Sequence, residues 1–549
     1  MINWSNFKVV GRELECLVDA FESGWVSGGP YVEKLESGLE CIFPGSTALA
    51  VGNGTSALQL SFQTLGLKPG DHVVVPSFCF QAASNVLRQL GASPVFCDVD
   101  PLSWNQSVRA IQMACTTRTV GIVVVHNYGV AAPIADISEW ARKQGLWLIE
   151  DCAEAWFSQH SGRYVGQFGD IATFSMHATK TISCGEGGVI LINNPEMVAK
   201  ARLLRSHGLD RAKTQYLHEC AGNNYRLSNL LAAVAYAQLE QRDSIVLKQV
   251  ENADMYRRYL GAHWAIRTQS SLPQSTDYLW AVACSVWFDG LTISRDRLML
   301  LLKDRGIETR PGFFPASCLH YNDDSALIHS KVADRLHQTI IVLPCALTLE
   351  ADEIKYICET MIGLIEQHRK DIQFRVIDAA KVCNATRLVE DFYGSLNIGR
   401  KSFRYFEKRS FEIIANHRST LLLEVNSVIV GYGHLDPESN IVWLGICLAD
   451  LVAGKGWGKL LMRELLAAAE KLDIQTRFMS ETGFRISQTE EVWMRNRKKV
   501  NPMRKHAKPA GWIFEKSLHL CLVSPSCVLM DMDLAGQGYA VIVISSEMP

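Results

Sequence analysis

Short apolar segments separated by helix-like stretches are the feature that most constrains the fold of residues 1–370. The apolar segments are 73–76, 94–99, 121–125 and 146–151, and helix-like segments such as 80–91 and 134–144 lie between them. A strand that is apolar along its whole length is buried on both faces, so the pattern predicts an α/β fold with a largely parallel sheet between layers of helices. Ligands of such sheets bind beyond the carboxyl ends of the strands.

The chain of 549 residues is too long for a single hydrophobic core. Its pattern turns polar around 365–375 and then restarts. Two apolar runs within 419–433 predict a β-hairpin, 443–448 predicts a further strand, and a glycine-rich turn leads into an amphipathic helix at 459–472. We therefore expect two domains, 1–370 and 373–549.

Composition narrows the class of protein. A net charge of −2 predicts no general affinity for nucleic acid or for an anionic membrane. The 16 cysteines are scattered singly, without Cys-x-x-Cys spacing, which predicts no metal site. The first residues lack the basic start and apolar run of a signal peptide, and no apolar stretch nears the ~20 residues of a membrane helix. We expect a soluble, cytoplasmic enzyme.

Gly54, Thr55 and Ser56 precede an apolar helical pattern and form a candidate phosphate loop. Glycine lets the backbone approach an anion closely, and the two hydroxyl residues stand where the dipole of a helix N-terminus favours a phosphate. The alternative is a capped helix that binds nothing.

Lys180 and Asp151 complete a set of groups that suits pyridoxal phosphate. Lys180 lies between strand-like segments 171–175 and 187–192 among Ser, Thr and Gly residues, and Asp151 ends an apolar strand. The lysine would form the Schiff base, the aspartate would keep the ring nitrogen protonated, and the glycine-led loop would bind the phosphate. A surface lysine and a turn-capping aspartate are the alternatives.

Residues 10–368 resemble the DegT/DnrJ-type nucleotide-sugar aminotransferases of pyridoxal-phosphate fold type I. The motifs that carry the resemblance occur in order along the chain: 24–30, 53–58, 76–80, 126–129, 150–155, 174–188, 222–226, 310–311 and 343–344.

The resemblance implies roles for residues that bind the cofactor. Phe80 should stack on the pyridine ring, and Thr55, Ser56 and Ser175 should hold the phosphate. Asn224 should reach the phosphate of a neighbouring subunit, which implies a homodimer.

The resemblance also implies the reaction. Lys180 would be both the Schiff-base lysine and the acid/base that moves a proton. Relatives that dehydrate sugars carry histidine there, so lysine indicates transamination, with L-glutamate as donor and a nucleotide-linked keto-deoxysugar as acceptor. Position C4 is favoured over C3 because segments 150–155 and 180–188 look like the perosamine-type branch. Glu154, also expected at the cofactor, stands where many relatives carry glutamine or histidine.

The second domain contains a candidate coenzyme A loop. Three glycines at alternate positions expose successive amides at a helix start, where a pyrophosphate could bind; plain turns look alike. The loop residues are Gly454, Lys455, Gly456, Trp457 and Gly458. With the hairpin, the 443–448 strand and a predicted strand at 528–534, residues 374–535 resemble a GNAT-type N-acetyltransferase, which implies acetyl-CoA as cosubstrate.

Two departures weaken that second resemblance. Ala453 stands where the family usually has Arg or Gln, and its frequent C-terminal tyrosine is missing from 501–512. Glu424, Tyr432 and His434 are candidate acid/base residues, and each could instead be structural. The basic residues between 495 and 508 are interpreted first as a solvated face of the protein, and second as a contact for the phosphates of coenzyme A or of a nucleotide sugar.

The sequence thus predicts a bifunctional enzyme of amino-sugar biosynthesis, which aminates a nucleotide-linked sugar and then acetylates the new amine. Three alternatives stay open. The C-terminal domain could acylate a different substrate or only bind a ligand, the N-terminal domain could act on a non-nucleotide substrate such as a cyclitol, or the chain could be a regulator that senses a ligand without turnover.

Overall fold

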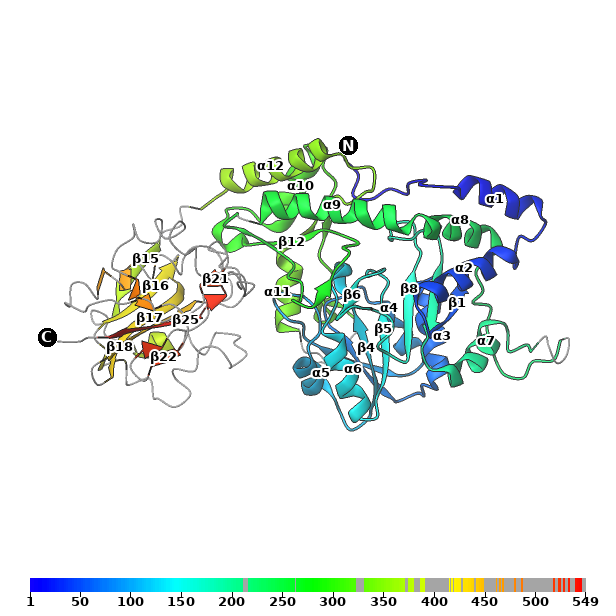
Figure 1. The fold of residues 1–549 in the computed structure, drawn as a ribbon, viewed down its shortest axis with the longest axis horizontal. Helices are drawn as coiled ribbons and strands as arrows, with labels where there is room; N and C mark the ends of the chain where they lie inside the picture. The colour runs from blue at the N-terminus through cyan, green and yellow to red at the C-terminus, as the bar shows by residue number, and fades with distance from the viewer. Residues whose placement is uncertain are drawn as a thin grey trace. The chain divides into compact units, whose positions relative to one another are not determined.

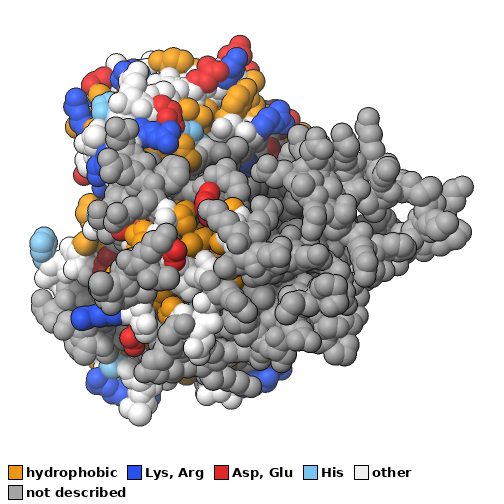
Figure 2. All heavy atoms as spheres, turned by 90° about the vertical axis from the view of Figure 1, so that its left-hand side faces the viewer, with side chains coloured by type: hydrophobic (Ala, Val, Ile, Leu, Met, Phe, Trp, Pro, Cys, Tyr) orange, Lys and Arg blue, Asp and Glu red, His pale blue; other side chains and the backbone are white. Residues whose placement is uncertain are grey.

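The computed structural model describes residues 1–210, 216–261, 263–321 and 330–370, and, from residue 374 onward, a set of strands with a few neighbouring residues. The chain divides into two compact units, Met1–His368 and Arg369–Pro549 (Figure 1). Within the described residues, the helices are all too short or too polar to cross a bilayer. Figure 2 shows basic and acidic side chains mixed over one face of the described surface.

A seven-stranded sheet forms the centre of the first unit, in the order β1-β9-β8-β5-β4-β2-β3. The strands are β1 (Thr47–Val51), β2 (His72–Pro76), β3 (Ser93–Cys97), β4 (Thr119–Val125), β5 (Trp147–Asp151), β8 (Ile171–Ser175) and β9 (Gly188–Ile192). Neighbours from β3 to β8 pair in parallel, whereas β9 is antiparallel to both β8 and β1. The predicted, largely parallel sheet is confirmed, and the four apolar segments became β2, β3, β4 and β5.

Helices cover both faces of this sheet. They are α3 (Gly54–Leu65), α4 (Ala82–Gln89), α5 (Val108–Ala114) and α6 (Ile134–Lys143). Val73 and Val75 of β2 pack in one cluster with α3 and α4, while Val74 packs in another with α5 and α6. Successive strand residues point to opposite faces, so burial on both faces requires the unbroken apolar run seen in the sequence.

The rest of the first unit, where the structure describes it, contains eight further α-helices of 8 to 19 residues and two smaller sheets. The helices are α1 (Glu13–Glu22), α2 (Pro30–Ile42), α7 (Val198–Arg205), α8 (Asn229–Glu240), α9 (Arg242–Leu260), α10 (Arg295–Lys303), α11 (Lys331–Thr339) and α12 (Ala351–Gln367). An antiparallel sheet of β10 (Ile266–Thr268), β12 (Ala283–Val286), β14 (Ile340–Val342) and β13 (Arg310–Pro311) packs against α9, α10 and α12. The third sheet is β11 (Ser275–Thr276), β6 (Gln159–His160) and β7 (Arg163–Tyr164).

The second unit contains a five-stranded antiparallel sheet. Its strands are, in spatial order, β15 (Phe374–Asp378), β16 (Ser419–Val425), β17 (Val428–Glu438), β18 (Ile441–Leu448) and β25 (Tyr539–Ser545). The predicted hairpin and the strand at 443–448 are confirmed as β16, β17 and β18.

The strand predicted at 528–534 is wrong. Two short strands there, β23 (Cys527–Val528) and β24 (Met532–Asp533), pair with β22 (Leu522–Ser524) and β21 (Ser517–Leu518). The sheet is completed instead by β25, whose run of valine and isoleucine favours an extended strand more than the Met-Asp-Met-Asp sequence does.

Candidate active site

The topology brings the predicted residues to one edge of the large sheet. Strands β1, β2, β5 and β8 run in the same direction, so their carboxyl ends lie at the same edge. Gly54 follows β1, Phe80 follows β2, Asp151 ends β5 and Ser175 ends β8. Lys180 lies in the connection from β8 to β9, which starts and finishes at this edge. This is where open α/β sheets bind their ligands.

The start of α3 offers the groups that an anion needs. The Asn53 side chain caps the helix by accepting the Ser56 N–H at 2.8 Å. The first turn of any helix leaves N–H groups without partners in the helix, and its dipole favours an anion there. Thr55 is exposed. A Cβ on Gly54 would lie 3.1 Å from the Cβ of Ser175, so the end of β8 packs directly against the helix start.

Asp151 is a buried acid at the end of β5. Burial is the main cause that raises its pKa to about 6, and the charge of Glu154 raises it further. The Ala153 N–H, which donates to Oδ1 at 3.1 Å, and the charge of Lys180 act in the opposite direction. A buried carboxylate with little compensation favours a cationic partner, and a protonated pyridine nitrogen is one.

Lys180 points into the site and is fixed by two side chains. Its side chain is only 13% exposed, and Nζ lies 3.4 Å from Oε1 of Glu154. The same Nζ lies 3.6 Å from the ring centroid of Trp280. The second oxygen of Glu154 accepts the Tyr128 N–H at 2.9 Å. Sequence reasoning missed Trp280, because it lies a hundred residues after the lysine and belongs to no local motif.

Phe80 and Asn224 lie on the surface of the described unit. Phe80 is 68% exposed, and an aromatic ring left open to solvent fits a platform for a planar ligand. Asn224 is exposed and accepts a hydrogen bond from the Arg226 guanidinium at 2.9 Å. The residues present therefore fit pyridoxal phosphate, with a lysine, a buried acid, an exposed ring and a helix start at one edge.

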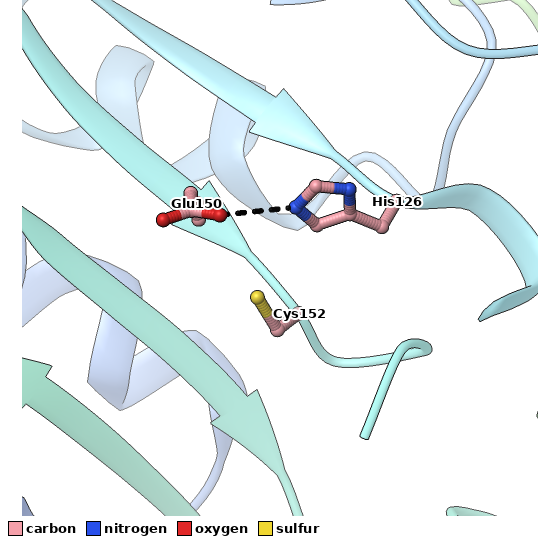
Figure 3. Close-up of side chains that lie close together, drawn as sticks. All are labelled: His126, Glu150 and Cys152. Atoms are coloured by element: carbon pink, nitrogen blue, oxygen red, sulfur yellow. Dashed lines mark hydrogen bonds and ion pairs between the residues drawn. The ribbon is translucent and has the colours of Figure 1, made fainter. Parts of the chain in front are cut away.

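A buried cluster includes the two sequence neighbours of Asp151, and Figure 3 shows its three side chains, His126, Glu150 and Cys152. His126, Glu150 and Cys152 place their potential ligand atoms within 4.8 Å of one another. His126 accepts the Ala132 N–H at Nδ1 and contacts Glu150 through Nε2 at 3.4 Å. Glu150 also accepts three backbone N–H groups from residues 166–169 at 2.6–2.8 Å.

The hydrogen bonds of this cluster mark it as structural. Burial, followed by the neighbouring carboxylates, raises the pKa of the Cys152 thiol well above its usual range, which disfavours the thiolate that a metal requires. The lone pairs of Glu150 are occupied by backbone donors. The cluster therefore ties the 166–169 loop to β5 and supports the strand that carries Asp151.

Some of the candidate residues of the second unit lie outside the described residues, and others lie on its five-stranded sheet. The predicted loop Gly454, Lys455, Gly456, Trp457 and Gly458 lies outside the described residues. Glu424 is half-buried on β16. Tyr432 and His434 are buried on β17 with ring centroids 5.2 Å apart, and the His417 ring stacks on His434 at 4.6 Å.

Comparison with known proteins matches residues 9–362 to the DegT/DnrJ/EryC1/StrS aminotransferase family. GDP-perosamine synthase of Escherichia coli O157:H7 is 34% identical over 354 residues, which cover 64% of this chain and 95% of that protein. The enzyme of the same name from Vibrio cholerae is 35% identical, with 63% and 95% covered. The dTDP-4-dehydro-2,3,6-trideoxy-D-glucose 4-aminotransferase of Saccharopolyspora spinosa is 30% identical, with 67% and 98% covered.

Solved structures show the same fold. The aminotransferase TlmJ from Streptoalloteichus hindustanus superposes with a TM-score of 0.62 at 28% identity, over 67% of this chain and 99% of that one. An aminotransferase from Psychrobacter cryohalolentis superposes with a TM-score of 0.63 at 27% identity, over 67% and 100%.

Proposed function

The chain belongs to the DegT/DnrJ/EryC1/StrS aminotransferase family, whose fold type I architecture its first unit has, and on that premise we propose that it transfers the amino group of L-glutamate to a nucleotide-linked keto-deoxysugar. The observation that carries the proposal is the position of Lys180. Its ammonium is held inside the edge of the sheet beside two buried carboxylates, Asp151 and Glu154, instead of reaching into solvent.

Pyridoxal phosphate, when bound, supplies an aldehyde that links to amines and a ring that withdraws electrons from the bond being broken. Lys180 would hold it through Nζ and, when detached, move the proton at the substrate carbon. Asp151 would pair with the ring nitrogen, and Phe80 would cover one face of the ring. The start of α3, with Thr55 and Ser56, and Ser175 would bind the phosphate.

The names of the relatives support the class of acceptor. Two are synthases of a GDP-linked sugar and one is a 4-aminotransferase of a dTDP-linked sugar. We infer a nucleotide-linked keto-deoxysugar as substrate and position C4 as the site of amination. The test incubates the protein with glutamate and a panel of 3-keto and 4-keto nucleotide sugars, with mass spectrometry of the products. Amination of the 3-keto sugars alone would overturn the C4 assignment.

A homodimer is supported by the outer face of α1. Leu14, Val18 and Phe21 follow helical spacing and are 69%, 45% and 67% exposed, while Cys16 and Ala20 of the same helix are buried. An apolar stripe on the solvent face of a helix favours burial in an interface. We infer that a second copy of the chain covers it, with Asn224 reaching the partner's phosphate site. Light scattering of a Leu14→Ser, Phe21→Ser variant should show monomers where the unchanged protein is dimeric.

For the second unit we propose N-acetylation of the new amine with acetyl-CoA. The support is the resemblance of 374–535 together with the chemistry, since the product of the first site is the nucleophile for the second. Positioning a deprotonated amine near a thioester supplies much of the rate of such a transfer. Products formed with both glutamate and acetyl-CoA should show two successive mass gains. A single gain, even at saturating acetyl-CoA, would refute the acetyltransferase half.

A further inference from the structure

Trp280 contacts both the ammonium of Lys180 and the backbone that precedes it. The ring centroid lies 3.6 Å from Nζ of the lysine, and the indole N–H donates to the carbonyl of Thr179 at 2.6 Å. The tryptophan comes from the segment just before β12, whereas the lysine lies between β8 and β9. One side chain from a distant part of the unit thus fixes both the direction of the lysine and the loop that carries it.

The tryptophan ring is itself held rigidly. It is 8% exposed and belongs to a buried cluster that includes Tyr128. Trp4 packs edge-on against it at 5.7 Å with an interplanar angle of 83°. The backbone N–H of Tyr128 in turn holds Glu154, the carboxylate that contacts the ammonium. Both groups that contact Nζ are therefore anchored in the same core.

The pairing of a ring face and a carboxylate suits an ammonium that has lost most of its water. The lysine side chain is only 13% exposed, so few hydration sites remain for its charge. A cation over an indole face gains about 0.5–2 kcal/mol, more when it is desolvated. A lysine has a flexible four-carbon stem, and these two contacts restrict it to one place.

We propose that Trp280 is a positioning residue for transamination: with Glu154, its ring holds Nζ of Lys180 in place whenever the lysine is not bonded to the cofactor. The inference rests on the proposed function, in which a substrate amine displaces the lysine as a neutral amine; the freed Nζ then takes the proton from the substrate Cα and becomes the ammonium that the ring face and the carboxylate stabilise until it gives the proton up again. A lysine free to swing into solvent would often be out of reach at that moment, and lost orientation slows proton transfer.

The test compares Trp280→Leu, which removes the ring face, with Trp280→Phe, which keeps a face and removes only the indole N–H. Trp287→Leu is the matched control, because among the described side chains the Trp287 ring packs edge-on against Trp264, with ring centroids 5.8 Å apart, whereas the ring over Lys180 is that of Trp280. Single turnovers with glutamate are followed by absorbance, with protium or deuterium at Cα. Trp280→Leu should be about tenfold slower at an unchanged apparent Kd for glutamate, with a larger isotope effect. Trp280→Phe should stay within about threefold of the unchanged protein.

A second readout needs no turnover. The cofactor-free full chain is treated with an amine-directed reagent, and modification at Lys180 is counted by peptide mass spectrometry. Removing the ring should make Lys180 react several-fold faster in Trp280→Leu, and Trp287→Leu should match the unchanged protein. Thermal unfolding verifies that each variant is folded.

The outcomes separate this inference from the function on which it depends. A Trp280→Leu protein with unchanged turnover, isotope effect and labelling would overturn the positioning role, as would a loss in Trp280→Phe equal to that in Trp280→Leu. If instead the protein without any substitution gains no absorbance with pyridoxal phosphate and does not convert glutamate, the proposed aminotransferase function is refuted.

Discussion

At the scale of the residue, Lys180 differs from the surface lysines of the chain in what surrounds it. Lys143 on α6 has a 63% exposed side chain and pairs with Glu139 across one helical turn. Such exposed pairs contribute little to stability. Lys180 is 13% exposed and contacts a buried carboxylate and a ring. A lysine in such surroundings requires a structural or chemical reason, and covalent attachment of an aldehyde cofactor is the reason we infer.

We expect Lys180→Ala to abolish amination and the visible absorbance that pyridoxal phosphate gives with the unchanged protein. Borohydride should fix the cofactor to the unchanged chain at Lys180 and to no peptide of the variant. Lys143→Ala is the control and should keep both colour and activity. A coloured, active Lys180→Ala protein would mean that another lysine holds the cofactor.

Asp151 gives a pH prediction with a definite sign. Its pKa is raised from 3.8 to about 6, so the cofactor-free protein still carries the proton up to about pH 6. The stability gained from burying the protonated acid is complete below about pH 4 and is lost as the pH rises through 6. The proposed pairing with the ring nitrogen needs the carboxylate form of Asp151, so cofactor affinity should fall about tenfold per pH unit below 6.

The measurement is a set of absorbance titrations with pyridoxal phosphate between pH 5 and 8. Asp151→Asn is the matched comparison, since it keeps the shape of the side chain without the titration. Its affinity should be lower at pH 8 and should lack the step at about pH 6. If the cofactor affinity of both proteins falls in the same way as the pH is lowered, the pH dependence belongs to a group other than Asp151.

At the scale of the element, the site depends on how closely β9 approaches the start of α3. A Cβ on Gly188, the first residue of β9, would lie 2.6 Å from the carbonyl carbon of Asn53 and 2.9 Å from the Gly54 nitrogen. Both are backbone atoms and cannot rotate away. The contact therefore couples the strand that follows the lysine loop to the turn that we propose binds the phosphate.

We expect Gly188→Ala to push the turn away from its position, at a cost of about 1–3 kcal/mol in stability, typical of overpacking. Cofactor affinity should fall together with stability. Gly363 on α12 is the control, because a Cβ there meets open space. Gly363→Ala should be more stable by up to about 1 kcal/mol, since alanine favours a helix interior. Urea unfolding measures both, and an unimpaired Gly188→Ala protein would contradict the packing argument.

At the scale of the whole molecule, two units on one chain make a prediction about order of reaction. If amination precedes acetylation, Lys180→Ala should stop both products when a keto-sugar is supplied. A bulky substitution in the predicted coenzyme A loop, Gly456→Val, should stop only acetylation and leave the amino sugar to accumulate. Mass spectrometry of the two reaction mixtures distinguishes these outcomes. If the Gly456→Val protein does not accumulate amino sugar, or if both variants still form the acetylated product, the second unit does not take part in this reaction as proposed.

The sequence by itself determined the strands and the local motifs of the first unit. The short apolar runs within 73–76 and 146–151 favour buried strands, because a strand that is buried on both faces needs apolar residues at successive positions. Asp151, Lys180 and the Gly54–Ser56 loop were recognisable for a similar reason, since each stands next to a strand or a helix start that its own neighbours define.

Only the tertiary structure decided what contacts the lysine. Trp280 and Glu154 contact it from separate segments, and Tyr128 from a third segment holds Glu154 through its backbone N–H. The contact between His126 and Glu150 joins the residue after β4 to β5. No local pattern encodes these contacts, because they depend on which strands become neighbours and on how side chains from different segments fill one core. The residue types that the proposed chemistry needs could therefore be predicted from the sequence. The side chains that hold Lys180 in place could not, because they come from residues far apart in the chain that meet only when it packs.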